Sequence, residues 1–81
     1  MRVETLFFAS YRETVGLGRL EVSLDEGARA ADLVRTLRER GHPFDRLPAT
    51  PAVAVNERYV SLDTPLSADD TIALIPPVAG G

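Results

Sequence analysis

Gly80 and Gly81, which end the printed sequence, are the residues whose type and position suggest chemistry. Glycine has no Cβ, so a carboxylate that follows this pair can approach another surface closely and pass through a narrow channel. Pro76 and Pro77 precede it, and proline fixes φ at about −65° and donates no backbone hydrogen bond, so the pair ends a β-ladder. A tail over residues 76–81 could extend roughly 20 Å, at about 3.3 Å per residue, beyond a domain over 1–75.

A carboxylate reacts as an acyl donor only after activation, usually as an acyl-adenylate made from ATP. Gly16-Leu17-Gly18 has neither the length nor the lysine of a phosphate-binding loop. His42 has no oriented serine and carboxylate partners nearby in the sequence, so no catalytic triad is indicated. We therefore expect this chain to be no enzyme by itself: another protein would use ATP to activate Gly81, and this chain would be its macromolecular substrate.

The composition narrows the classes of function. The sequence has no cysteine and one histidine, which excludes disulfides and thiolate metal sites and leaves no metal-binding pattern. We expect no metal and no bound cofactor. The net charge of −3 argues against nucleic-acid binding and fits an acidic module that docks on a basic protein surface. No apolar stretch is long enough for a membrane span and no leader pattern is present, so we expect a cytoplasmic protein.

The first third of the chain predicts two strands with a short helix between them. Val3–Ala9 is rich in β-forming residues, and Leu20–Leu24 alternates apolar and polar residues. Between them, Ser10 and Glu13 have the spacing of a capping box, in which each side chain satisfies a backbone N–H at the start of a helix. We expect that helix over Tyr11–Val15, ended by Gly16.

A longer helix is predicted over Ala30–Arg40. Its apolar residues recur with helical spacing, which indicates one face packed on a sheet, and Gly41 with Pro43 ends it. That face consists of Ala30, Leu33, Val34 and Leu37. The remaining predicted elements are one helical turn at Phe44–Leu47 and strands over Ala52–Val55, Tyr59–Ser61 and Thr71–Ile75.

This order of elements predicts an α+β domain with the β-grasp, or ubiquitin-like, arrangement. A mixed sheet would pack on one main helix, with a short extra helix between strands one and two. The last strand would lie parallel to the first at the sheet centre, so the residues after it would leave the domain freely.

Several blocks of the sequence carry a family resemblance. They are Leu6-Phe7-Phe8-Ala9 with Arg12, Glu13 and Gly16; Ala54-Val55-Asn56; Asp63, Pro65 and Leu66 with Asp69 and Asp70; and Pro76-Pro77-Val78-Ala79-Gly80-Gly81. Together they cover essentially the whole chain. They closely resemble the small subunit of molybdopterin synthase, a MoaD-type sulfur carrier of the ThiS/MoaD ubiquitin-like family.

The resemblance implies a function in molybdenum cofactor biosynthesis. In this family a ubiquitin-activating-type adenylyltransferase adenylates the terminal glycine, and a sulfurtransferase replaces the adenylate by sulfur. The resulting thiocarboxylate enters the synthase large subunit and gives its sulfur to cyclic pyranopterin monophosphate. Two small and two large subunits form the family's heterotetramer.

The same resemblance assigns roles to residues of this chain. Gly81 would hold the adenylate and then the thiocarboxylate, and the inserted tail would comprise Pro76, Pro77, Val78, Ala79 and Gly80. Phe7 and Ile75 would belong to the apolar surface that meets the partners, whereas Phe8 is expected in the core. The family often has aromatic residues just before the two prolines. Here Leu74 and Ile75 occupy those positions, so aliphatic packing is expected instead.

Three alternatives share the tail or the fold. A sulfur carrier for thiamine, cysteine or tRNA thiolation would use the same activation chemistry, and only the Pro-Pro-Val block, the length and the Leu6-to-Gly16 block favour molybdopterin. A ubiquitin-like modifier would join the same activated glycine to lysines of other proteins. An inert β-grasp interaction module would use neither glycine.

Overall fold

The computed structural model describes residues 1–77, with five strands, two α-helices and one short 3₁₀ helix. The elements are β1 (Arg2–Phe7), α1 (Ala9–Val15), β2 (Arg19–Ser23), α2 (Ala30–Arg38), η1 (Phe44–Arg46), β3 (Ala52–Val55), β4 (Arg58–Val60) and β5 (Thr71–Ile75). All predicted elements are present, each within two residues of its expected bounds. Within this part of the chain, no helix has the length and apolar character needed to cross a membrane.

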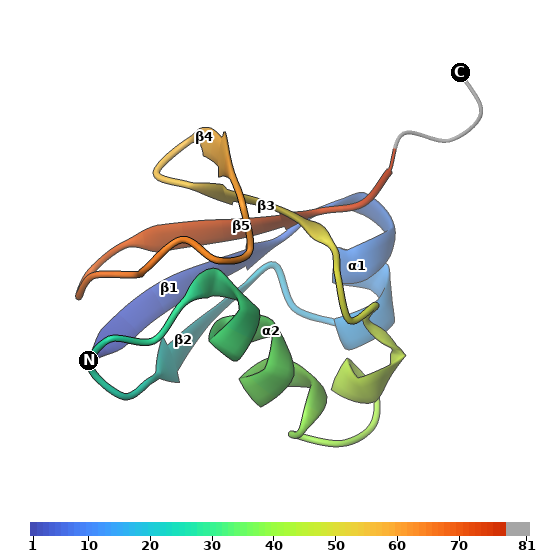
Figure 1. Cartoon of the computed structure of the whole chain (residues 1–81). Helices are drawn as coiled ribbons and strands as arrows, with labels where there is room; N and C mark the ends of the chain where they lie inside the picture. The colour runs from blue at the N-terminus through green and yellow to red at the C-terminus, as the bar shows by residue number, and fades with distance from the viewer. Residues whose placement is uncertain (78–81) are drawn as a thin grey trace.

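The five strands form one mixed sheet in the order β2-β1-β5-β3-β4 (Figure 1). The last strand, β5, lies at the centre, parallel to β1 and antiparallel to β3. Leu74 of β5 is paired with Phe7 on one side and with Val53 on the other. This topology confirms the predicted β-grasp arrangement.

One face of the sheet packs on α2 to form the core. Alternate residues of the strands point inward, as Val3, Ile72 and Leu74 do, because successive side chains of a strand point to opposite faces. The predicted apolar face of α2 is confirmed: Ala30, Leu33, Val34 and Leu37 are each no more than 1% exposed. A domain of this size depends heavily on that single layer of contacts.

The start of α1 differs from the prediction. The helix begins at Ala9, its N-cap is Phe8, and no side chain caps it. Ser10 lies inside the helix, where its carbonyl accepts a hydrogen bond of 2.8 Å from the Thr14 hydroxyl. The predicted capping box at Ser10 and Glu13 is therefore wrong, because the sheet pairing ends at Phe7 and the chain turns into the helix at once. Its predicted end is confirmed, with Gly16 at a φ of 77°.

The second helix is capped and ends earlier than predicted. Asp32 accepts a hydrogen bond of 2.8 Å from the Arg29 backbone N–H through its carboxylate. That N–H, and then the neighbouring Arg35 guanidinium, lower the pKa of Asp32, although partial burial opposes them. The helix ends at Arg38 rather than Arg40 because Arg40 already forms a shorter-range bond, from its N–H to the Leu37 carbonyl.

Candidate functional site

The central strand leads directly to the predicted tail. Leu74 is fully buried, Ile75 and Pro76 are half-buried, and Pro77 is exposed. The side chains thus become steadily more exposed from Leu74 to Pro77, where the chain leaves the sheet. Val78, Ala79, Gly80 and Gly81 lie outside the described residues, so their predicted roles stay predictions.

A mostly apolar groove of about 470 Å³ lies beside the base of the tail. Four separate stretches of sequence form it: α1, the connection that leads into the first residue of β3, β4, and the end of β5 with the two prolines after it. Its lining residues are Tyr11, Pro48, Thr50, Pro51, Ala52, Tyr59, Ile75, Pro76 and Pro77. Both tyrosines of the chain and four of its six prolines are among them. Proline backbones are stiff, so this groove has a preformed shape.

Burial contradicts the predicted assignments of the two neighbouring phenylalanines. Phe7 is only 2% exposed, and its ring packs edge-to-face on Phe44 with centroids 6.2 Å apart. Phe8 is 47% exposed. The prediction that Phe7 contributes to the surface and Phe8 to the core is therefore wrong for the free chain. The reason is the strand period: Phe7 shares its inward face with Val3 and Thr5, so Phe8 must point elsewhere.

The exposed aromatic side chain of Tyr59 was not predicted from the sequence. Tyr59 is 71% exposed on β4 and borders the groove. The pairing register places it across the sheet from Ala54, which in turn lies opposite Ala73 and then Leu6. These residues form a row of apolar side chains on the sheet face that α2 does not cover. Alternation with the half-buried Val60 is the sequence signal that could have identified Tyr59 as outward-facing.

Ile75, which was predicted together with Phe7 to meet the partners, does lie at the groove. It is half-buried, it lines the groove, and it is paired with Ala52. The expected aliphatic contact before the prolines is thus available, with Tyr59 as an aromatic neighbour in the same groove.

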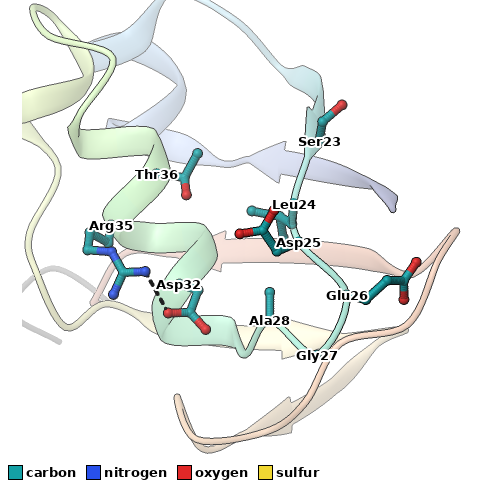
Figure 2. A pocket seen from close by; sticks show the side chains of 9 residues that line it. All are labelled: Ser23, Leu24, Asp25, Glu26, Gly27, Ala28, Asp32, Arg35 and Thr36. Carbon is teal, nitrogen blue, oxygen red and sulfur yellow. Dashed lines mark ion pairs between the residues drawn. The ribbon is translucent and has the colours of Figure 1, made fainter.

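A second hollow, of about 320 Å³, lies between the β2–α2 connection and α2 (Figure 2). Figure 2 shows its main polar contact, an ion pair of 2.8 Å between Asp32 and Arg35. This hollow is at the other end of the sheet, since Leu24 bonds to Met1 whereas the tail leaves beside Phe7. Its lining residues include no histidine, cysteine or lysine.

Other reactive groupings are also missing from residues 1–77. No group of three metal-ligating side chains comes together in this part of the chain. The His42 imidazole lies 3.7 Å from the Asp45 carboxylate, but both side chains are more than half exposed and neither lines the groove. The feature best suited to function is therefore the tail base with its apolar groove, which fits binding to another protein.

Comparisons with known proteins agree with this geometry. The ThiS family model matches residues 5–81. The "Molybdopterin synthase sulfur carrier subunit" of Chlamydomonas reinhardtii is 31% identical over 83 residues, covering all of both chains. The "Small archaeal modifier protein 3" of Haloferax volcanii is 33% identical over 92 residues, also covering all of both chains.

Solved structures resemble the whole domain. A putative molybdopterin converting factor subunit 1 from Pyrococcus furiosus has a TM-score of 0.83 and 34% identity, over 96% of this chain and 99% of that chain. A complex of subunits 1 and 2 of the molybdopterin-converting factor from Helicobacter pylori contains a chain with a TM-score of 0.71 and 27% identity, with complete coverage of both.

Proposed function

This chain belongs to the ThiS family, within the sulfur carriers of molybdopterin synthase, and from that premise we propose how it carries sulfur. An adenylyltransferase of the ubiquitin-activating type joins the Gly81 carboxylate to AMP from ATP and releases pyrophosphate. A sulfurtransferase then supplies sulfur at the oxidation level of sulfide, which displaces AMP, and Gly81 holds a thiocarboxylate. The large subunit of the synthase accepts this end, the sulfur passes to cyclic pyranopterin monophosphate, and water restores the Gly81 carboxylate.

The observation that carries the proposal is the position of β5. A strand that is hydrogen-bonded on both sides and buried holds the base of the tail firmly, while Pro76 and Pro77 prevent the ladder from continuing. The family match extends through Gly81. Val78, Ala79 and Gly80 are small, and so suit a tail that passes through a narrow channel.

The groove and its neighbours supply the docking surface in this proposal. Tyr59 and Ile75 line the groove beside the tail base. Phe8 adds exposed apolar area directly after β1, whose last residue is paired with Leu74, and takes the surface role first predicted for Phe7. Apolar and aromatic side chains of this kind provide much of the binding energy of protein interfaces. The partner is the synthase large subunit, and the complex is a heterotetramer of two small and two large subunits in the cytoplasm.

Intact-mass measurement tests the central step. The chain is co-expressed with its adenylyltransferase and sulfurtransferase, and a variant that lacks Gly81 serves as the control. We expect one oxygen-to-sulfur replacement in the full chain and none in the control. A full chain that keeps its oxygen under conditions that charge another member of the family would contradict the proposal.

A second candidate function follows from the relative named as a modifier protein. The same activated Gly81 would be joined by an amide bond to lysines of target proteins. Affinity purification of the tagged chain under denaturing conditions distinguishes the two: covalent target adducts favour the modifier. Recovery of the large subunit under native conditions favours the synthase, and recovery of a thiazole synthase would indicate a carrier for thiamine.

A further inference from the structure

Asn56 and Asp70, which belong to two of the sequence blocks noted above, meet at the start of β5. Asn56 begins the turn between β3 and β4, and it makes three hydrogen bonds to the residues that open the central strand. Its side-chain Nδ2 donates to Asp70 Oδ1 at 2.9 Å, and its Oδ1 accepts from the Thr71 N–H at 3.0 Å. Its own N–H donates to the Thr71 carbonyl at 2.8 Å.

Asp70 uses its other oxygen to hold the preceding turn. Oδ2 accepts a hydrogen bond of 2.7 Å from the Ser67 N–H. The Asp70 carbonyl accepts from the Glu4 N–H at 2.9 Å, so β1 is joined to the same point. The pair therefore connects three segments at the end of β5 opposite to the tail, at the start of the red strand in Figure 1.

The alternation of inward and outward side chains in β5 does not by itself define its register. Ile72 and Leu74 point inward, and both are large and aliphatic, while Thr71, Ala73 and Ile75 point outward. A shift of two residues would keep every side chain of β5 on its present face, because the side-chain period of a strand is two, although it would bring Asp70 or Pro76 to one inward position. Such a shift would move the base of the tail by about 6.6 Å, since each residue of a strand rises about 3.3 Å.

We propose that the Asn56–Asp70 pair is a positioning device that fixes the register of β5 and so the point at which Pro76 leaves the sheet. Polar side chains with directional bonds add to the apolar pattern and distinguish one register from another. The effect on register concerns this chain alone, whereas its effect on sulfur transfer rests on the proposed function. Neither residue lines the groove, so docking and positioning are separable.

Three variants isolate the side-chain bonds. Asn56→Gly removes them but tolerates the φ of 49° at this position and keeps the backbone N–H. Asn56→Asp places two carboxylates against each other. The exchange variant N56D/D70N restores the set, because Asn at 70 donates to Asp at 56 and still accepts from the Ser67 N–H. Asp32→Ala is the matched control, since it weakens the cap of α2 without touching β5.

The first measurement is the register itself. Backbone NOEs between β5 and β3, such as those across the Val53 and Leu74 pair, report which residues face each other. We expect Asn56→Gly and Asn56→Asp to weaken these NOEs and to speed amide exchange along β5. The exchange variant should restore both. Asp32→Ala should leave the NOEs unchanged and speed amide exchange only in proportion to its loss of global stability. A wild-type register and wild-type exchange in Asn56→Asp would overturn the proposal.

The second measurement is single-turnover sulfur transfer from the charged carrier to the large subunit. In the two single variants, the rate constant at saturating partner should fall about tenfold below that of the wild-type chain, because small misplacements of reacting groups slow a reaction strongly. The Kd for the large subunit should stay within about twofold of the wild-type value. The exchange variant should recover the rate. An unchanged rate in both single variants would overturn the functional part, whereas absence of transfer by the wild-type chain would instead refute the proposed function.

Discussion

Replacing each of the two adjacent phenylalanines by alanine should separate folding from docking. Phe7 is buried among core side chains and packs on Phe44. Its truncation leaves a cavity, so we expect Phe7→Ala to lower the free energy of unfolding by about 3–5 kcal/mol. That is a large fraction of the stability of a small domain. Phe8→Ala should change the free energy of unfolding by less than about 1 kcal/mol, because nearly half of the side chain is already in water.

The effect on binding should be the reverse for Phe8. A phenylalanine side chain has about 200 Å² of surface, so an exposed fraction of 47% leaves roughly 90 Å² for a partner to cover. At about 25 cal/mol per Å², covering it contributes about 2 kcal/mol, or a change of about 30-fold in Kd. Phe8→Ala should therefore weaken binding to the large subunit by about that factor.

Urea unfolding followed by circular dichroism gives the first quantity, and titration calorimetry with the large subunit gives the second. Leu17→Ala is a suitable control, since Leu17 is also exposed, at 41%, but precedes the edge strand β2, whereas Phe8 follows β1, which is paired with β5. The reasoning would be refuted if Phe8→Ala unfolded as readily as Phe7→Ala. It would also be refuted if Phe8→Ala bound the large subunit as tightly as the wild-type chain.

Three further predictions test other parts of the structure. Thr5→Val should raise the free energy of unfolding by about 1 kcal/mol in urea titrations, because the Thr5 hydroxyl is fully buried and has no hydrogen-bond partner among residues 1–77; a loss of stability would contradict this. The pKa of Asp32 is lowered in the folded chain, so its carboxylate stabilises the fold at pH values above its unfolded pKa of about 4. This stabilisation is lost as the pH falls through the folded pKa. In urea titrations, the stability difference between the wild-type chain and Asp32→Asn should therefore shrink in acid. Deletion of Gly81 should abolish sulfur transfer and leave the melting temperature unchanged, because a terminal glycine adds little to packing; transfer by the truncated chain would refute its role.

The sequence was a good guide wherever one local pattern dominated. The apolar face of α2 follows directly from helical spacing. Thr71–Ile75 alternates and is followed by two prolines, and the structure confirms the bounds predicted from that pattern. The central position of β5 followed from the order of elements. The capping box failed because Ser10 and Glu13 have the right spacing but lie after the true start of the helix, which tertiary pairing of β1 decides.

The candidate site was less predictable because distant segments build it. Tyr11 and Tyr59 are far apart in the sequence, and only the fold brings both beside Pro76. The Phe7 and Phe8 pair shows a second difficulty: two identical neighbours differ in burial only through the phase of the strand, and an error of one residue reverses both.

The central place of β5 also has a mechanical consequence. A partner that draws the tail into a channel pulls on Pro76 along the axis of the strand. Because β5 is bonded to β1 on one side and β3 on the other, this load falls on both ladders in shear. Bonds loaded in this way must break together, whereas an edge strand can be peeled off one bond at a time. The domain should therefore resist unravelling while its end is pulled repeatedly into and out of its partners.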